Sequence, residues 1–153
     1  MKLRKRSGAS SSSKLPEPPI FFLDRNLGRK AVADALRQAS VEVHVHDEHF
    51  PPDARDEEWL AEVGKRGWIV LTKDTRIRYR SSELAALVKA EISAFVLTAG
   101  NLRGEEMAAV FVEALPAIRR FVARYSPPLV AGITKSGHVS LLIHGSRTSG
   151  RRT

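Results

Sequence analysis

Three aspartates occupy positions at which an α/β fold would bring their carboxylates together. Asp24 ends the apolar run IFFLD, and Asp74 comes two residues after Thr72, the last residue of the apolar run WIVLT. Asp56 begins the helical segment that leads into that second run. Parallel strands end at one edge of a sheet, and the helix between them returns antiparallel, so we expect all three carboxylates at the carboxyl edge. The spacing therefore predicts one acidic crevice.

A cluster of carboxylates favours a hard divalent cation. Like charges a few Å apart raise one another's pKa unless a cation neutralises them. Mg²⁺, or Mn²⁺ in its place, takes oxygen ligands, and one or two such ions leave room for phosphate oxygens and an attacking water in an in-line displacement at phosphorus. Basic residues near these acids would then hold the phosphates of a polymer. They are Lys73, Arg76, Arg78 and Arg80 around Asp74, and Arg25 beside Asp24.

Each of these groups also has an ordinary structural explanation. Asp56 suits a helix N-cap, with Glu57 and Glu58 in a first turn that favours negative charge. Asp24 and Asp74 could be turn formers after strands, and the bases beyond Asp74 a solvated stretch. The hypothesis of a site therefore depends on the convergence of three acids.

The segments that position these acids alternate between strand and helix. Four short apolar runs predict strands: residues 20–24, 41–46, 68–72 and 93–98. Four segments with helical spacing predict helices: residues 26–40, 56–65, 82–89 and 104–125, with a break or kink at Pro116. Residues 129–143 predict two strands about Ser136 and Gly137, a hairpin at the sheet edge. The fold class is therefore α/β with a mainly parallel sheet.

The composition indicates one domain between basic ends. The chain has 153 residues, 42% of them apolar, which suffices for a core, and no apolar run resembles a membrane span or a secretion signal. It has no cysteine, which removes disulfides and thiolate zinc sites and suits a reducing cytoplasm. We expect a disordered basic leader at 1–19, a domain at 20–143 and a flexible basic tail at 144–153.

The net charge of +8 lies mostly in these ends. The leader carries five bases and one acid, and the tail carries three bases. Within the domain, eight acids fall between Glu42 and Glu62, and six bases fall between Lys65 and Arg80. This segregation suggests a site with two electrostatic faces, or a solvated helix beside a solvated loop.

A longer pattern joins these features: FFLDRNLGRKAVADALRQASVEVHVHDEHFPPDARDEEWLAEVGKRGWIVLTKDTRIRYR, continued by SAFVLTAGNLRGEEMAAVF. From about Ile20 to Tyr125 it resembles the PIN-like domain family, which includes the VapC-type toxins of bacterial toxin–antitoxin systems. The resemblance implies a PIN-like three-layer α/β/α fold. It also implies a ribonuclease that depends on Mg²⁺ or Mn²⁺, with acids clustered at the carboxyl edge of the sheet.

The resemblance extends to individual residues. Asp24 in LDRN, Asp56 in DEEW and Asp74 in LTKD match the family's acids, and Glu57 could replace Asp56 as a metal ligand. Many members carry a fourth acid after the next strand. Here LTAGN offers only Thr98 and Asn101, which could bind water or substrate but carry no charge.

These features lead to one main hypothesis, a Mg²⁺-dependent endoribonuclease that is the toxin of a type II toxin–antitoxin system. Asp24, Asp56 and Asp74 would hold the metal and carry the catalysis. Five residues would bind the RNA: Arg76, Arg78, Lys73, Asn26 and Asn101. The expected partners are RNA and an antitoxin that inserts a basic side chain among the carboxylates; self-association is left open.

Other chemistries fit the sequence less well. His44, His46 and His49 suggest a zinc site or a histidine acid–base pair, with His44 and His46 on one face of a strand. His138 and His144 have no evident partner. An aspartyl phosphotransferase would need a second aspartate where Asn26 stands, and neither a receiver-domain pattern nor a Gly-rich phosphate loop is clear. A non-catalytic module that binds a protein or a nucleic acid is the alternative function.

Overall fold

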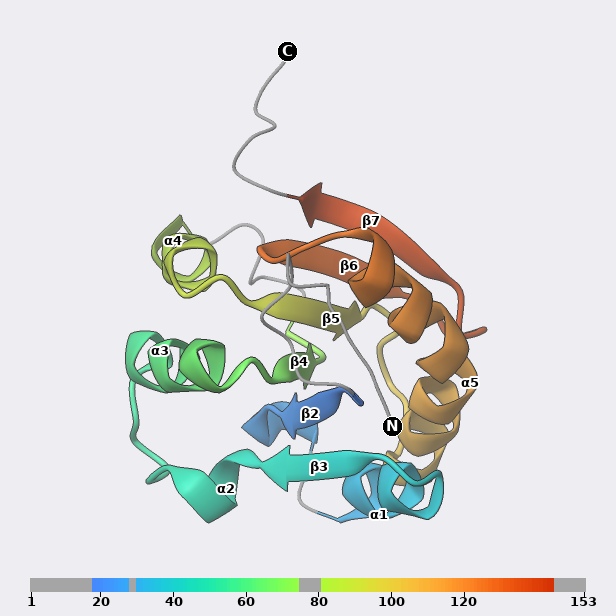
Figure 1. Cartoon of the computed structure of the whole chain (residues 1–153). Helices are drawn as coiled ribbons and strands as arrows, with labels where there is room; N and C mark the ends of the chain where they lie inside the picture. Colours follow the sequence, from blue (N-terminus) through green and yellow to red (C-terminus); the bar gives the residue numbers. More distant parts are fainter. Residues whose placement is uncertain (1–17, 28–29, 75–80, 145–153) are drawn as a thin grey trace, which may run out of the picture.

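The computed structural model describes residues 18–27, 30–74 and 81–144 and contains one six-stranded sheet (Figure 1). The strand order is β3-β2-β4-β5-β6-β7, and every neighbouring pair is parallel except the antiparallel pair β6 and β7. The strands are β2 (Ile20–Leu23), β3 (Glu42–Val45), β4 (Ile69–Thr72), β5 (Ser93–Leu97), β6 (Leu129–Ile133) and β7 (Val139–His144). The predicted α/β class, the mainly parallel sheet and the C-terminal hairpin are confirmed.

Helices cover both faces of the sheet (Figure 1). The longer helices are α1 (Ala31–Gln38), α3 (Asp56–Arg66), α4 (Ser81–Lys89) and α5 (Gly104–Arg124), and the short ones are η1 (Arg25–Leu27) and α2 (His46–His49). Phe21 and Leu23 of β2 pack in the core with α1 and α5, while Phe22 packs in the core with α3 and α4. The run IFFL is apolar at successive positions because its strand is covered on both faces.

Helix α3 has ends that suit its orientation. Its first turn holds three acids and its last turn holds Lys65 and Arg66, so the charges complement the helix dipole at both ends. Gly67 ends the helix in the left-handed conformation, with φ of 71°. Because α3 leads directly into β4, the helix starts at the carboxyl edge of the sheet and ends near the first residue of β4.

A glycine allows α3 and α4 to lie close together. A Cβ added to Gly64 would overlap the carbonyl oxygen of Ala90, at the end of α4. Because backbone cannot move aside as a flexible side chain can, this contact sets the distance between the helices.

The structure differs from the predicted elements in three details. The second strand ends at Val45, because the Glu48 carboxylate accepts a hydrogen bond from the Val45 N–H at 3.3 Å and His46 begins α2. Of the predicted break or kink at Pro116, the break does not occur, since α5 continues through this exposed residue while Leu115 and Ile118 beside it are buried. Strand β7 also includes His144, which we assigned to the tail.

Most of the predicted leader and tail, residues 1–17 and 145–153, lies outside the described residues. Across the part of the chain that the structure describes, no helix has the length and apolar character needed to cross a bilayer.

The contact at Gly64 leads to a stability prediction. Gly64→Ala should lower the free energy of unfolding by roughly 1–3 kcal/mol, because the new methyl group overpacks the contact between α3 and α4. The higher helix propensity of alanine offsets only part of this loss. Urea unfolding measures the change. Gly100→Ala is the control, since a Cβ there meets nothing within 4 Å. Equal stability of the two variants would contradict the close-contact explanation.

Candidate active site

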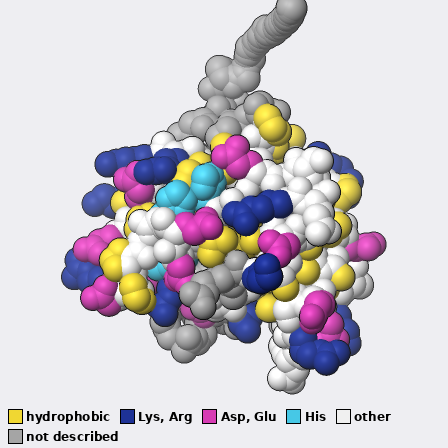
Figure 2. Space-filling model, turned by 90° about the horizontal axis from the view of Figure 1, so that it is seen from below, with side chains coloured by type: hydrophobic (Ala, Val, Ile, Leu, Met, Phe, Trp, Pro, Cys, Tyr) yellow, Lys and Arg dark blue, Asp and Glu magenta, His cyan; other side chains and the backbone are white. Residues whose placement is uncertain are grey.

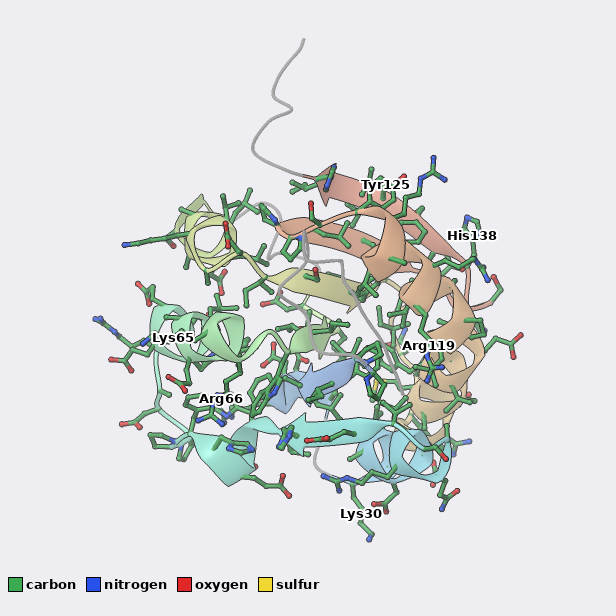
Figure 3. All side chains as sticks on the ribbon, viewed as in Figure 1. Lys30, Lys65, Arg66, Arg119, Tyr125 and His138 are labelled. Atoms are coloured by element: carbon green, nitrogen blue, oxygen red, sulfur yellow. The ribbon has the colours of Figure 1, made fainter. Side chains whose placement is uncertain are left out.

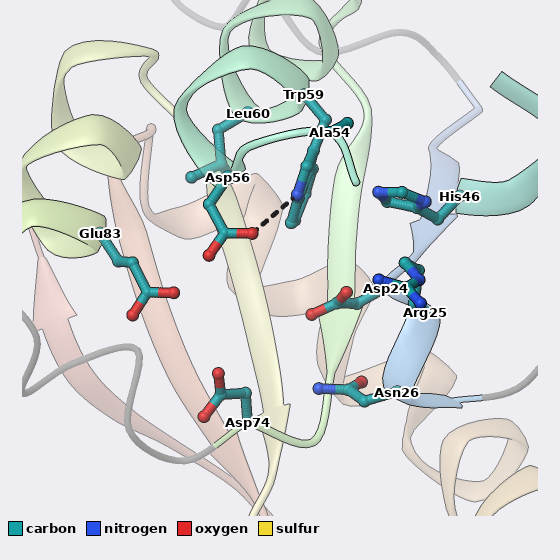
Figure 4. Close-up of a pocket in the computed structure, with 10 residues that line it drawn as sticks. All are labelled: Asp24, Arg25, Asn26, His46, Ala54, Asp56, Trp59, Leu60, Asp74 and Glu83. Atoms are coloured by element: carbon teal, nitrogen blue, oxygen red, sulfur yellow. Dashed lines mark hydrogen bonds between the residues drawn. The ribbon is translucent and has the colours of Figure 1, made fainter. Parts of the chain in front are cut away.

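A cavity of about 370 Å³ opens at the carboxyl edge of the sheet, on the side of α3 and α4 (Figure 4). The three predicted aspartates all line it, although they come from different elements. The lining residues are Asp24, Arg25, Asn26, His46, Ala54, Asp56, Trp59, Leu60, Asp74 and Glu83. The structure thus brings the predicted acids together and adds a fourth, Glu83.

The hydroxyl of Thr72 organises the floor of the cavity. It donates a hydrogen bond to Asp24 Oδ2 at 2.8 Å. It accepts one from Asn26 Nδ2 at 3.1 Å and one from the Asp74 N–H at 3.1 Å. Asn26 Oδ1 in turn accepts from the Lys73 N–H at 3.3 Å. This buried side chain therefore ties the end of β2 to the turn after β4 and orients two of the acids.

Asp24 is costly to ionise in this position. Burial raises its pKa above the ordinary value of 3.8, and the charge of Asp56 raises it further. The hydrogen bonds from Thr72 and from the Arg25 backbone act in the opposite direction and lower the pKa. A cation in the cavity would offset the repulsion between these carboxylates.

Asp56 is fixed by its own helix. The indole N–H of Trp59 donates to Asp56 Oδ1 at 2.9 Å, and Trp59 is buried (Figure 4). The predicted N-cap explanation for Asp56 is wrong, because Arg55 occupies the cap and its N–H donates to Glu58 Oε1 at 3.3 Å. Asp56 is the first helical residue, and its carboxylate faces the cavity.

Glu57 lies elsewhere. It lines a separate groove between α3 and α4, together with Lys65 and Lys89. One residue corresponds to about 100° of helix rotation, so the side chain of Glu57 leaves α3 in a different direction from that of Asp56. The choice between Asp56 and Glu57 depends on which side of α3 packs inward, and Leu60 and Val63 settle that rotation.

The sequence analysis did not identify Glu83 as a candidate site residue. It lies in the first turn of α4, and its side chain points into the cavity near Asp56 and Asp74 (Figure 4). The rule that located Asp56, an acid in the first turn of a helix that returns antiparallel, would also have found Glu83. It comes from a helix before β5, whereas we looked for the fourth acid after β5.

His46 is a second residue whose position the sequence did not indicate. Its side chain is 1% exposed and lies among the rings of Phe22, Phe50 and Trp59, with centroid distances of 6.1, 5.5 and 5.7 Å. Burial lowers its pKa, and the charge of Asp24 only partly opposes this. A neutral imidazole therefore forms part of the cavity wall.

The predicted pairing of His44 with His46 is wrong, because the strand ends between them. His44 stacks on Trp68 with ring centroids 4.1 Å apart, and its Nδ1 lies 3.0 Å from His49 Nε2. Its Nε2 lies 2.9 Å from Glu42 Oε2. Figure 2 shows histidine side chains side by side on the surface, beside acidic side chains. This group lies apart from the residues that line the cavity.

The predicted phosphate-binding residues have varied positions. Arg76, Arg78 and Arg80 lie outside the described residues. Lys73 and Asn101 line a second cavity beside the first. Arg25 donates to the Pro52 carbonyl oxygen at 2.8 Å, and its Nε lies 4.0 Å from Asp47.

Described basic side chains elsewhere are spread around the surface. Figure 3 shows this for Lys30 near α1, Lys65 and Arg66 on α3 and Arg119 on α5. Arg25 is the one Lys or Arg side chain among the described residues that line the acidic cavity, which four acids share.

The donor set of the cavity suits a hard divalent ion. Its four acids offer carboxylate oxygens, the ligand type that Mg²⁺ prefers. In the described ranges, no three His, Asp or Glu side chains approach closely enough to form a metal shell by themselves. Water would have to complete the shell, which agrees with Mg²⁺, because this ion usually binds one or two carboxylates and keeps several waters.

Comparison with known proteins gives two matches of different extent. A family model described as "PIN like domain" matches residues 19–99. The curated protein "Putative ribonuclease VapC45" of Mycobacterium tuberculosis (strain ATCC 25618 / H37Rv) is 29% identical over 126 residues, which cover 80% of this chain and 91% of that protein. No solved structure matches significantly.

The burial of Asp24 leads to a prediction on stability and pH. Without divalent ions, Asp24→Asn should raise Tm at pH 7 by roughly 2–5 °C, because the amide keeps an acceptor for Thr72 but carries no charge. Since the pKa of Asp24 is higher in the folded than in the unfolded protein, ionisation of Asp24 destabilises the fold at neutral pH. This destabilisation is absent below pH 3.8, the ordinary pKa, where the carboxyl is protonated in both states.

The gain in Tm should therefore shrink as the pH falls toward that value. Thermal unfolding in a chelator, followed across pH, measures it. Asp34→Asn is the control, because that aspartate forms an exposed ion pair with Lys30 on α1. A gain that is independent of pH would contradict the explanation.

Proposed function

The chain belongs to the PIN-like domain family, and we propose that it is a metal-dependent endoribonuclease that acts as the toxin of a type II toxin–antitoxin system. The observation that carries this proposal is the acidic cavity, which four carboxylates line at the carboxyl edge of the sheet. The similarity to a protein named as a ribonuclease supports RNA as the substrate.

We assign the metal to the acids of the cavity. Asp24, Asp56, Asp74 and Glu83 would hold one or two Mg²⁺ or Mn²⁺ ions, and Glu57 would not take part. When bound, the ion supplies positive charge that stabilises the phosphorane-like transition state and activates the attacking water.

The protein's own residues prepare the acids for this role. The Thr72 hydroxyl and the Trp59 indole fix Asp24 and Asp56 before any ligand arrives. Preorganised ligands lose little entropy when they bind, and they define where the phosphate must lie. Apolar surface from Trp59 and Leu60 excludes water from one side of the cavity, which strengthens the electrostatic interactions inside.

The substrate side of the reaction needs positive charge and polar contacts. We propose that Lys73, Arg76 and Arg78 hold the RNA phosphates, and that Asn26 and Asn101 contact the nucleotides beside the cut. In the hydrolysis, water adds to phosphorus and one P–O ester bond breaks, so the strand is cut within its length. The net charge of +8 assists association with RNA in a way that depends on salt.

The same cavity explains how an antitoxin could inhibit the enzyme. A basic side chain inserted among the carboxylates would neutralise them as a cation does and would block the phosphate. We propose a nuclease domain at residues 20–143, a cytoplasmic location and an antitoxin partner of this kind. A non-catalytic binding module remains the alternative function, and it predicts no cleavage.

The direct experiment incubates the purified full chain with labelled RNA in Mg²⁺, in Mn²⁺ and in a chelator. We expect cleavage with either ion and none in the chelator. Expression in a bacterial host should arrest growth, and Asp24→Asn should relieve the arrest. Absence of cleavage, together with toxicity that Asp24→Asn leaves intact, would reject the enzyme.

The four acids lead to a prediction with a binding readout. Asp74→Asn and Glu83→Gln should each weaken Mn²⁺ binding at least tenfold by calorimetry, because each removes a negative ligand from the cavity. The single-turnover cleavage rate should fall by roughly 100-fold or more for Asp74→Asn, the loss typical of removing one group that stabilises the transition state.

Glu57→Gln is the matched control, because Glu57 occupies the neighbouring groove and not the cavity. We expect wild-type affinity and rate for this variant. If Glu57→Gln weakens Mn²⁺ binding as much as Glu83→Gln does, the assignment of ligands is wrong.

The phosphate role of Arg76 leads to a prediction on salt dependence. Arg76→Ala should weaken RNA binding for all sequences and reduce the slope of log K against log[salt] by about 1, since one phosphate contact is lost. Fluorescence anisotropy at several salt concentrations gives the slope. An unchanged slope would remove Arg76 from the RNA-binding surface.

A further inference from the structure

A second cavity of about 270 Å³ lies beside the acidic one, where β4 and β5 end and α5 begins. We call it the Lys73–Asn101 cavity. Its lining residues are Lys73, Leu97, Thr98, Ala99, Gly100, Asn101, Leu102 and Met107. None of them lines the acidic cavity, so the carboxyl edge carries two distinct hollows.

The two cavities flank the same edge from opposite sides of the sheet. Leu97 and Met107 belong to the core under α1 and α5, whereas Trp59 and Leu60 of the acidic cavity belong to the core under α3 and α4. Successive residues of an extended chain point to opposite faces. Lys73 and Asp74 accordingly enter different cavities although they are neighbours in sequence.

Asn26 connects the two cavities. Its side chain lines the acidic cavity and donates to Thr72 Oγ1 at 3.1 Å, and its Oδ1 accepts from the Lys73 N–H at 3.3 Å. A polymer that crosses this edge would therefore place one unit at Asp74 and the adjacent unit at Lys73.

The lining of the second cavity suits a planar ring with polar edges. Leu102 offers apolar surface, and beneath it the cavity floor reaches the nearly buried side chains of Leu97 and Met107, which are 1% and 6% exposed. Asn101 offers an amide with both donor and acceptor atoms, which can pair with the edge of a base. Lys73 is exposed and offers a cation for the attached phosphate.

The size of the cavity limits what it can hold. Cavities that enclose drug-sized ligands measure roughly 300–1,000 Å³, so this one admits a single small ring system. A base can enter only if it is not paired with a partner strand. Unpaired RNA fits this requirement.

The backbone holds Asn101 in place for such a contact. Its φ is 63°, in the left-handed region that asparagine tolerates better than most residues. Its side-chain amide has no hydrogen-bond partner among the described residues. The loop between β5 and α5 thus presents an exposed amide at the mouth of the cavity.

We propose that the Lys73–Asn101 cavity binds the base of the nucleotide next to the scissile phosphate in an unpaired RNA strand. This inference rests on the proposed ribonuclease function and makes the cavity a determinant of its sequence preference. Asn101 selects the base by its edge, and Lys73 holds the phosphate that links this base to the one being cut.

The test compares RNA with a substrate that has no base. Asn101→Gly removes the amide and accepts the positive φ, so the backbone is not strained. On the preferred RNA, kcat/KM should fall roughly 5- to 150-fold, the range for loss of a bidentate amide–base contact, and the preference at one position beside the cut should disappear. The loss on bis(p-nitrophenyl) phosphate should be at least fivefold smaller.

Leu102→Trp is a second variant, which fills the cavity and should weaken RNA binding in parallel. Gln38→Ala is the control, because it removes an exposed amide on α1, away from both cavities. Retention of the full sequence preference by Asn101→Gly and Leu102→Trp would overturn the inference while leaving the ribonuclease in place.

Binding measurements separate this inference from the proposed function. Anisotropy with short single-stranded RNAs uses Asp24→Asn as the background, so that no cleavage interferes. If the wild type cuts no RNA but binding depends on Asn101, the cavity binds a base, whereas the nuclease and the placement of that base beside a scissile phosphate are both rejected. If RNA neither binds nor is cut, both are rejected.

Discussion

The candidate site depends on one buried hydroxyl. Thr72 ends β4 inside the molecule, and its Oγ1 uses its single proton for Asp24 and receives the N–H of Asp74 and the amide of Asn26. A hydroxyl has one donor and two acceptor positions, so this arrangement satisfies it fully. Removing it would release two acids and the residue that connects the two cavities. The Thr72 side chain therefore links the pairing of β2 with β4 to the positions of Asp24 and Asp74 in the cavity.

The acidic cavity is a place where the fold accepts an electrostatic cost. Burial raises the pKa of Asp24, and Asp56 adds to the repulsion. Arg25, the one base lining the cavity within the described residues, has its guanidinium on the Pro52 carbonyl oxygen and beside Asp47. A structure that only needed stability would not keep such a group, because an uncharged side chain would fit with less cost. The electrostatic cost has an explanation if a bound cation neutralises the carboxylates and in turn binds a phosphate.

The scaffold makes this cost possible by holding its elements rigidly. Two cores, one on each face of the sheet, fix β2 and β4 so that their ends cannot separate. The close contact at Gly64 holds the C-terminal ends of α3 and α4 together, and the opposite ends of these helices carry Asp56 and Glu83. All four acids thus come from ends of elements whose middles are buried. Preorganisation of a site by packing far from it is a general route to precise geometry.

The sequence by itself determined the architecture and the edge at which the acids meet. Alternating apolar runs fix the direction of strands and helices, and direction alone places Asp24, Asp56 and Asp74 at the carboxyl edge. Direction does not fix the rotation of a helix or the end of a short strand. Tertiary packing decided that Asp56 and not Glu57 enters the cavity, that Glu83 joins it, and that His46 turns inward after Val45. It also placed Lys73 and Asp74 on opposite sides of the edge. These outcomes depend on which side chains fill the core, and residues distant in sequence supply them.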